Sequence, residues 1–422
     1  MPSISHATPL TPRPTKMNPP SQLDEPGRLR EIVALCCATG VPPEKISGQF
    51  KSLLPEEEVD WYGFTRAALP EGVLPLVYHH LLELRETAVP TELLAAFEGF
   101  YNSNRQRNSA LIQQLIKIMD FLKTHGIRAI PYKGPMLAAA AYGNADLRQV
   151  SDDVDILVHC RDFERAKDLL LLQGFQQWME LEYKSHLRQP VDNLEIDLHR
   201  SIIPRWYGFS LDFDEIWARR SHLVLSGTSL PCFSLEDFVI ALCLDLAKDA
   251  AQRNVVRLIK LCDIAQLLKA ERGMDWNRLL NRARSTGTIG PLFFGIRTLT
   301  PLFGVSLPET SLGNKEADLA LAALDGKKSR NILDASLHKI TDSIPAAIRH
   351  SMYEALLIAS LHDRAGAKIR TVLRPCLVPT IVDLQWVSLP RYLHYIYYIL
   401  RPIRLAIKYF PYYYQTLNRE RG

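Results

Sequence analysis

The sequence predicts an α+β protein in which a small mixed β-sheet lies between two helical regions. Two short segments, residues 153–158 and 194–199, have the apolar or alternating pattern of strands. Elsewhere apolar residues recur at intervals of three and four, as between residues 111 and 122, which is typical of amphipathic helices. The strand-like segments fall near the middle of the chain, so the sheet is expected there, with helices before and after it.

The 422 residues are enough for two to three domains. Six prolines among the first twenty positions, with Ser and Thr between them, predict a disordered arm without the apolar stretch of a secretory signal. An unstructured arm is preferred to a targeting role. The expected parts are a disordered Pro-rich arm (1–27), a helical N-terminal region (28–126), an α/β core (127–233), a helical C-terminal region (234–370) and an aromatic, basic tail packed on the body or on a partner (371–422).

Charge and cysteine content exclude some classes of protein. The net charge is only +4, so no global footprint of a nucleic-acid-binding protein is visible. The seven cysteines are scattered, and Cys36 and Cys37 are adjacent, so neither a zinc motif nor a disulfide framework is indicated. A reducing, cytoplasmic location is therefore expected.

The tail has an unusual composition. Residues 390–422 contain eight of the sixteen tyrosines and six Lys or Arg against one Glu. No apolar run approaches the ~20 residues of a membrane-spanning helix. One interpretation is a helix that binds a membrane surface or a partner. The preferred interpretation is a helix packed on the body with its basic ends exposed.

The strongest chemical signal is the acidic start of the first predicted strand. Side chains alternate along a strand, so Asp153 and Asp155 share a face, while Asp152 points to the other side or lies in the preceding loop. Two carboxylates on one face repel each other unless a cation lies between them. Mg²⁺, which prefers oxygen ligands and accompanies phosphate groups, is a natural candidate.

A further carboxylate is expected to join this pair. Glu195, Asp197 and His199 alternate with apolar residues and share one face of the second strand. If the two strands are neighbours, Asp197 reaches the same metal. An Asp-x-Asp pair alone is more often structural than metal-binding. The second strand, together with Lys133-Gly134 upstream, makes the metal site the preferred interpretation.

Lys133-Gly134 follows a short predicted strand at 127–130. Glycine allows the backbone to approach a phosphate closely, and Pro135 suits the first turn of a helix. The free N–H groups at such a helix start favour an anion, and Lys133 adds a positive charge. The alternative is an ordinary βα turn with a solvated lysine.

Downstream cations have two interpretations that the sequence leaves open. Arg148 either pairs with Asp152 or Asp153 or faces a phosphate. Arg257 and Lys260 are predicted to lie on one helical face, where they could line the triphosphate side of a cleft.

These motifs together resemble a poorly characterised nucleotidyltransferase family of the DNA-polymerase-β-like superfamily. The resemblance is carried by Lys133-Gly134, Arg148, Asp153-x-Asp155 and Asp197-Leu198-His199, and it extends from about Trp61 to Asp275-Trp276. The family pattern Arg-Leu-x-x-Leu-x-Asp matches residues 257–263. The chain departs from the pattern at Tyr132, where leucine is usual, at the added Asp152, and at Lys133-Gly134, where the superfamily has Gly-Ser or Gly-Gly.

The resemblance implies a nucleotidyltransferase core and a metal-dependent transfer of NMP from an NTP such as ATP, releasing pyrophosphate. The acceptor would be a hydroxyl or phosphate of a small molecule or peptide. A nucleic-acid end such as tRNA, or an inactive nucleotide-binding module, is the alternative. Mg²⁺, or Mn²⁺ in its place, would be held by Asp153, Asp155 and Asp197, which are the expected catalytic residues. His199 would orient Asp197 or the acceptor. The nucleotide would be bound by Lys133, Gly134, Arg148, Ser151, Arg257 and Lys260.

Overall fold

The structure is a computed structural model, and its described residues are 33–34, 37, 61–83, 90–151, 153–191, 194–209, 211–253, 256–269, 274–305, 354–379 and 381–419. Three expectations fall outside these residues. They are the disordered arm at 1–27, the orientation of Asp152, and residues 306–353 of the expected helical C-terminal region.

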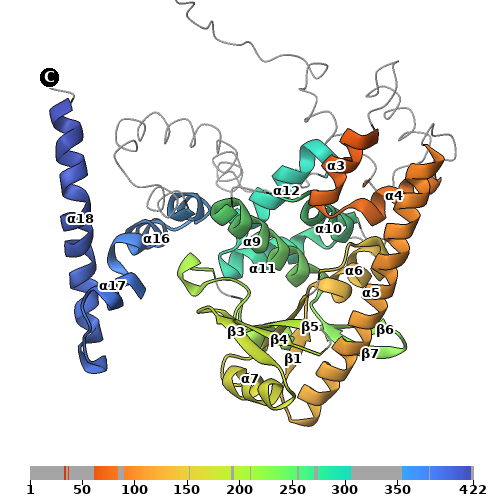
Figure 1. Ribbon diagram of the computed structural model, residues 1–422, viewed down its shortest axis with the longest axis horizontal. Coiled ribbons are helices and arrows are strands. Elements are labelled where there is room, and N and C mark those ends of the chain that lie inside the picture. Colours follow the sequence, from red (N-terminus) through yellow and green to blue (C-terminus); the bar gives the residue numbers. More distant parts are fainter. Residues whose placement is uncertain are drawn as a thin grey trace, which may run out of the picture.

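The centre of the molecule is a five-stranded mixed sheet (Figure 1). The strand order is β1-β2-β5-β4-β3, in which only β2 and β5 run parallel. The strands are β1 (Ala129–Pro131), β2 (Asp153–Val158), β3 (Gln176–Glu180), β4 (Lys184–Gln189) and β5 (Leu194–His199). The segments predicted as strands at 153–158 and 194–199 are therefore β2 and β5, and the expected mixed sheet is confirmed.

Short elements connect and border the sheet. Helix α6 (Gly134–Tyr142) and a 3-10 turn, η2 (Ala145–Leu147), join β1 to β2, and α7 (Phe163–Leu172) follows β2. After β5 come a second 3-10 turn, η3 (Arg205–Tyr207), α8 (Phe213–Ala218) and a separate hairpin of β6 (Ser221–Leu225) and β7 (Thr228–Cys232). Because β5 lies between β2 and β4, residues far apart in the chain meet at the centre of the sheet.

The N-terminal helices are α3 (Trp61–Glu71), α4 (Leu74–Glu83) and the 34-residue α5 (Thr91–Thr124). Helix α5 runs along one side of the molecule (Figure 1). Two buried asparagines on it fix the segment that leads into β2. The Asn104 amide donates to the carbonyls of Asp146 and Arg148 at 3.0 and 3.1 Å, and the Asn108 amide donates to Ala145 at 2.8 Å. Such bonds satisfy buried backbone carbonyls that no strand pairs.

Four helices form a layer over the sheet: α9 (Leu235–Arg253), α10 (Leu258–Lys269), α11 (Trp276–Thr286) and α12 (Ile289–Phe303). Helix α9 packs against α10, α11 and α12, and α10 packs against α6. Most of α9 is buried, as expected for a helix that is apolar nearly all round. The α+β class, with helical regions on both sides of a mixed sheet, agrees with the prediction.

The last described elements are α16 (Ala365–Leu377), α17 (Ile381–Trp386), a 3-10 helix η5 (Arg391–Ile396) and α18 (Tyr397–Arg419). The boundary expected at 370/371 falls inside α16. Helix α16 contacts η3, whereas α18 packs on α16, α17 and η5 and stands at the edge of the molecule (Figure 1). None of the described helices combines the length and apolarity needed to cross a bilayer.

Candidate functional site

The predicted site residues are arranged in rows across one face of the sheet. Asp155 on β2 pairs in register with Asp197 on β5, which pairs in turn with His186 on β4. In the next row His199 lies opposite Lys184. Because side chains alternate along a strand, these five residues share a face. The sequence prediction that Asp155 and Asp197 lie side by side therefore agrees with the register of the sheet.

Asp155, Asp197 and His199 are buried and bring one potential ligand atom each to within 4.8 Å of the others. In the described part of the chain this is the one group of its kind. Asp153 is not a member, because it lies one row further toward the start of β2, opposite Glu195. His199, expected only to orient Asp197 or the acceptor, instead lies as close as the carboxylates.

Lysine and histidine side chains surround these acids. Lys184 forms an ion pair with Asp197, and His186 Nδ1 lies 2.5 Å from the other Asp197 oxygen. The Asp155 Oδ1 atom accepts from His199 Nε2 at 2.9 Å and lies 3.4 Å from Lys133 Nζ. A cation was expected between the acids, with Mg²⁺ as the candidate, and two lysines of the protein itself contact Asp155 and Asp197.

The ionisation of the three acids differs accordingly. Burial opposes the charged form of Asp155, but Lys133 and the His199 hydrogen bond outweigh it, and its pKa lies well below the ordinary value. Burial likewise opposes ionisation of Asp197, yet the hydrogen bond from His186 leaves its pKa lowered. Burial raises the pKa of Asp153, and the neighbouring Asp155 adds to this shift. Asp155 and Asp197 are thus anionic acceptors, whereas Asp153 is the acid that the site stabilises least.

Lys133 and Gly134 occupy the start of α6, as predicted. Lys133 is the residue before the helix and is extended, and Pro135 lies in the first turn. Gly134 has φ +56°, a left-handed conformation that strains any residue with a β-carbon, and the carbonyl of Asp153 is its nearest neighbour. The helix N-terminus thus lies beside the acid strand, where its N–H groups favour an anion.

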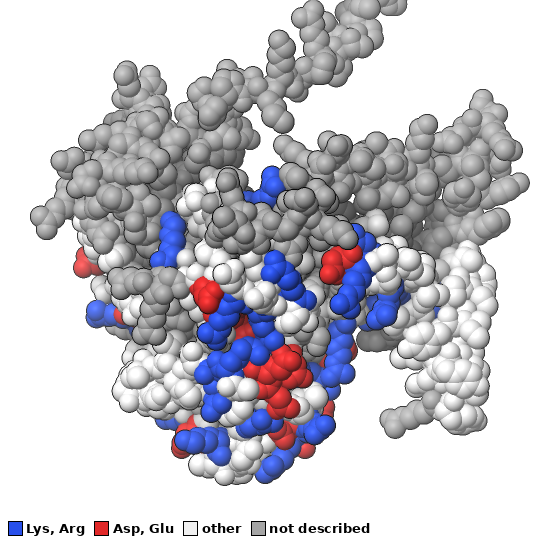
Figure 2. Space-filling view, turned by 180° about the vertical axis from the view of Figure 1, so that it is seen from behind, with Lys and Arg blue, Asp and Glu red and all other residues white. Residues whose placement is uncertain are grey.

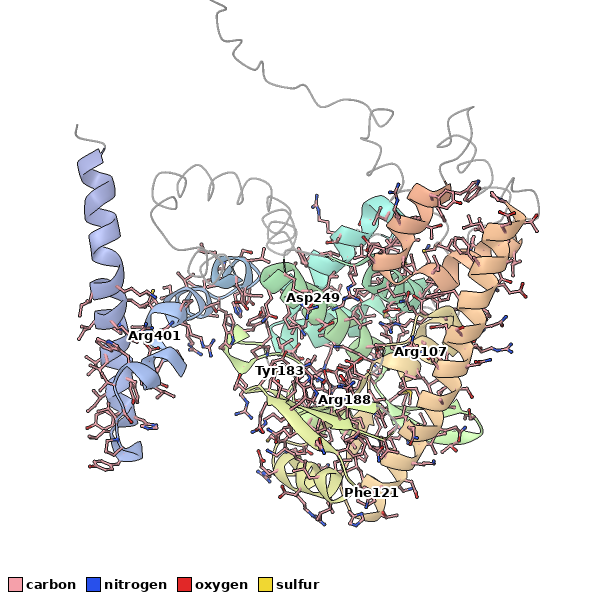
Figure 3. All side chains as sticks on the ribbon, in the orientation of Figure 1. Arg107, Phe121, Tyr183, Arg188, Asp249 and Arg401 are labelled. Carbon is pink, nitrogen blue, oxygen red and sulfur yellow. The ribbon has the colours of Figure 1, made fainter. Side chains whose placement is uncertain are left out.

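A second charged group from the helical layer adjoins this corner. Asp245 on α9 is buried and faces three ammonium groups: Lys133 at 3.4 Å, Lys248 at 2.6 Å and Lys260 at 2.5 Å. Lys260 also contacts Asp249, which Figure 3 labels above the sheet. Burial opposes ionisation of Asp245, but the lysines outweigh it, and its pKa lies well below the ordinary value.

The role of Asp245 was missed by the sequence analysis. The available signal was its position, because Lys248 and Asp249 follow Asp245 by three and four residues, so the three share a face of α9 beside the apolar run 238–244. Charged residues inside such a helix have to be paired when they are buried. Their partner Lys133 lies 112 residues away, which local periodicity does not reveal.

Arg148 pairs with a carboxylate that the sequence did not predict as its partner. Its Nε donates to both oxygens of Asp263, at 3.1 and 3.0 Å, and Tyr142 donates to the same carboxylate at 2.9 Å. Asp263 is wholly buried. The carboxylate that holds Arg148 is therefore Asp263 on α10 rather than Asp153.

The remaining predicted contacts lie at the edge of the site. Arg257 is exposed and precedes α10, so the expectation that it lies within the helix is wrong. The Arg257 carbonyl accepts from the Lys260 N–H at 3.2 Å. Arg257 therefore caps the start of α10 instead of lying on its face beside Lys260. Ser151 is exposed, and its hydroxyl lies 3.5 Å from the carbonyl of Asp153. The structure thus brings Lys133, Gly134 and Lys260 to the acids and leaves Arg257 at the surface.

The donor set fits a divalent cation. Asp155 and Asp197 offer carboxylate oxygens, which Mg²⁺ and Mn²⁺ prefer, and His199 offers a nitrogen. The Ser201 carbonyl lies 3.3 Å from His199 Nδ1. The hydrogen bond to Asp155 places a proton on Nε2, so a metal would bind this nitrogen only after that hydrogen bond is given up and the proton moves to Nδ1. There it would donate to the Ser201 carbonyl, an arrangement common among metal-binding histidines.

Comparisons with known proteins place this site in a family. Residues 57–304 match the sequence model of a family described as an uncharacterised nucleotidyltransferase. Comparison with curated proteins gives no match. Among solved structures, the antibiotic-resistance factor ANT(2'')-Ia is similar at 12% identity over 42% of this chain and 91% of that chain, with a TM-score of 0.32. An antigenic nucleotidyltransferase-like protein from Paracoccidioides brasiliensis is similar at 16% identity over 48% of this chain and 93% of that chain, with a TM-score of 0.27.

The family match covers more than half of the chain and contains the five-stranded sheet, α6 and the helices α9 and α10 that supply Asp245 and Lys260. It agrees with the resemblance found in the sequence motifs. The chain belongs to this nucleotidyltransferase family.

Proposed function

We propose that the protein is a metal-dependent nucleotidyltransferase that moves an NMP from an NTP to a hydroxyl or phosphate of a small molecule or peptide and releases pyrophosphate. The observation that carries the proposal is the placement of Asp155 and Asp197 in register on parallel strands, with His199 beside them. Lys133 and Lys184 contact these two acids, and Lys248 and Lys260 contact Asp245, which Lys133 also contacts. A site with anionic ligands at its centre and cations around it suits a metal-bound polyphosphate.

Asp155, Asp197 and His199 would hold the cation, with Asp153 next to them on the same face of β2. Divalent cations at such sites stabilise the negative charge on the attacking and leaving oxygens of a phosphoryl group. Mg²⁺ is the expected ion because the oxygens dominate the donor set, and Mn²⁺ would also be accepted because of the imidazole.

The lysines would bind the triphosphate. Lys133 bridges Asp155 and Asp245, and at 3.4 Å from each it is held less closely than an ideal ion pair. An ammonium group has three donors on a flexible stem, so it can exchange one anion for another. Once the carboxylates are neutralised, Lys133, together with Lys248 and Lys260, can turn to phosphate oxygens. Cation and NTP binding should therefore strengthen each other.

In the reaction, an acceptor oxygen attacks the α-phosphorus in line with the departing pyrophosphate, and the α–β phosphoanhydride bond breaks. The acceptor hydroxyl loses its proton to a nearby base, for which Asp197 is the candidate on this chain. The hydrogen bond from His186 and the ion pair to Lys184 hold the Asp197 carboxylate in place. An acceptor with a phosphate as nucleophile would need no base.

One observation favours the alternative of an inactive nucleotide-binding module. Because Lys133 and Lys184 pair with Asp155 and Asp197, and His186 and His199 lie within hydrogen-bonding distance of them, these two acids do not require a metal for stability. Binding and turnover must therefore be measured separately.

The decisive experiment is calorimetric titration of the full chain with each of the four NTPs in the presence of Mg²⁺, of Mn²⁺ or of EDTA. Wild type should bind one NTP only with a divalent cation. Asp155→Asn and Asp197→Asn should weaken this binding by about 10²–10³-fold, comparable to removing one preorganised charge-stabilising group. Pyrophosphate release and a mass gain of one nucleotide in pools of small molecules and peptides would then identify the acceptor.

Asp214→Asn is the matched control, because Asp214 is an exposed acid paired with Arg128 at 2.7 Å and lies on α8, away from the metal-ligand group. It should bind NTP like wild type. Equal binding by wild type, Asp155→Asn and Asp197→Asn would contradict the proposal. A tRNA pool is tested alongside the small-molecule and peptide pools. Cation-dependent NTP binding without pyrophosphate release in any of these pools would instead support the inactive module.

A further inference from the structure

We define the tail group as α16, α17, η5 and α18. Its last helix exposes apolar side chains and encloses arginines, the reverse of the usual arrangement. On α18 and the end of η5, the side chains of Tyr395, Ile399, Ile403 and Ile407 are between 46% and 65% exposed. They follow one another at intervals of four, so they form a single stripe along the helix. A helix on the surface of a water-soluble domain normally buries such a stripe.

Two arginines of α18, Arg401 and Arg404, point inward to α16 and α17. Arg401 donates to Asp383 at 2.6 Å and to the carbonyl of Pro375, and Arg404 donates to the other Asp383 oxygen at 2.6 Å. Asp383 is 1% exposed, so these are enclosed ion pairs. Figure 3 labels Arg401 on the side of α18 that faces α16 and α17. The polar side therefore fixes the helix, and the apolar side is left outward.

Helix α16 and its neighbour repeat this feature. Ile369, Leu373 and Leu377 are exposed at intervals of four along α16, and Leu384 and Trp386 are exposed on α17. Figure 2, which views the molecule from behind, shows few charged side chains on the outer column, which is α18. Several exposed apolar side chains gathered on one group of helices mark an interaction site.

The charge of the tail group indicates the partner. Residues 364–422 contain ten Lys or Arg against two Asp or Glu, whereas the preceding 363 residues contain 40 against 44. Arg364 and Arg370 border the apolar stripe of α16 and are exposed. Two tail groups facing each other would bring like charges together, which disfavours a second copy of the chain. A surface that is both apolar and anionic satisfies the tail group better.

We propose that the tail group lies on anionic phospholipid bilayers, with the Tyr395–Ile407 stripe inserted at the boundary between headgroups and acyl chains. Tyrosine and tryptophan side chains favour this boundary, because one end is apolar and the other polar. Arginine and lysine next to an inserted apolar face add attraction to anionic lipids. The protein binds the membrane surface in this way without spanning it.

The test uses the full chain and vesicles of phosphatidylcholine with or without phosphatidylglycerol, in a flotation assay. Wild type should float with the anionic vesicles and remain unbound with the neutral ones, and salt should release it. The double variant Ile399→Glu/Ile403→Glu should lower the bound fraction at least about tenfold, because two apolar insertions are lost. Unchanged circular dichroism spectra would show that both proteins are folded.

Leu172→Glu is the matched control, because Leu172 is an 81% exposed leucine on α7 outside the tail group, and it should float like wild type. No flotation of wild type, or equal flotation of the double variant, would overturn the proposal. Light scattering distinguishes the competing occupant. A dimer that the double variant dissociates, without vesicle binding by wild type, would assign the stripe to a second copy of the chain.

Discussion

Asp155 and Asp263 are both buried carboxylates with cationic partners, yet their surroundings are different. Asp263 receives two hydrogen bonds from one arginine and a third from Tyr142, all between 2.9 and 3.1 Å. Asp155 shares Lys133 with Asp245, at 3.4 Å from each, and has His199 as its close partner. We call the first arrangement closed, because the carboxylate has three short hydrogen bonds. We call the second open, because one flexible lysine is shared by two carboxylates at longer distances.

The comparison teaches how to separate structural from ligand-binding charges in one buried region. Arg148 shares one Nε–H between both Asp263 oxygens and so ties the segment before β2 to α10. A planar guanidinium is less free to change partners than an ammonium group. Lysines are mobile point charges that can exchange partners. We therefore expect the lysines around Asp155 and Asp245 to bind a polyphosphate. We expect the Arg148–Asp263 pair to stabilise the fold.

The largest effect should follow from opening the closed pair. Asp263→Ala removes the partner of Arg148 and leaves a guanidinium largely buried without a counter-charge, which should cost ~3–5 kcal/mol of unfolding free energy. Urea denaturation measures this loss. Asp214→Ala removes an exposed ion pair and should cost less than ~1 kcal/mol. A loss for Asp263→Ala as small as that of this control would mean that the pair does not hold α10 in place.

Breaking the open arrangement should change binding instead. Lys133→Ala should weaken cation-dependent NTP binding by about ten- to a hundredfold, the value of a charge-assisted hydrogen bond, because the contact is present in ground and transition states alike. Calorimetry with Mg²⁺ gives the dissociation constant. Lys167→Ala, which removes ion pairs with Glu164 and Glu180 far from the acids, should leave binding unchanged. If both variants bind alike, Lys133 does not contact the nucleotide.

Asp245→Asn sharpens the comparison, because it removes the anion that three lysines share. The lysines then repel one another, and the nucleotide-free protein should lose ~1–3 kcal/mol of unfolding free energy. Saturating Mg·NTP should raise the melting temperature of this variant more than that of wild type, because the phosphates replace the missing negative charge. Thermal unfolding with and without Mg·NTP measures the difference. An equal ligand-induced shift in the two proteins would show that the lysines do not face the triphosphate.

The contrast between the two regions also explains what the sequence could predict. Asp155, Asp197 and His199 were identified because strand alternation fixes a face, and the predicted neighbouring of the two strands was correct. Arg148 and Asp263 are separated by 115 residues on elements whose relative placement no local pattern specifies. Arg257 was assigned to the helix from its spacing of three to Lys260, but the helix begins one residue later, at Leu258. Spacing alone does not locate the end of a helix to within one residue. Periodicity therefore finds charges on one element, and packing decides which charges meet.

The smallest effect should distinguish the two acids of β2 from each other. The pKa of Asp153 is raised by burial and by Asp155, so the folded protein holds its charged form unfavourably at neutral pH. Asp153→Asn should therefore raise the unfolding free energy in EDTA by up to ~1 kcal/mol, the order of one pKa unit. The pKa of Asp155 is lowered because Lys133 and His199 outweigh burial, so Asp155→Asn should reduce stability under the same conditions. Opposite signs for isosteric changes two residues apart would mean that Asp155 is a structural anion as well as a proposed ligand, whereas Asp153 is retained at a cost to folding. If both substitutions lower the unfolding free energy equally in EDTA, the two positions do not differ electrostatically. Asp153 would then not be an acid whose charge only a bound cation favours.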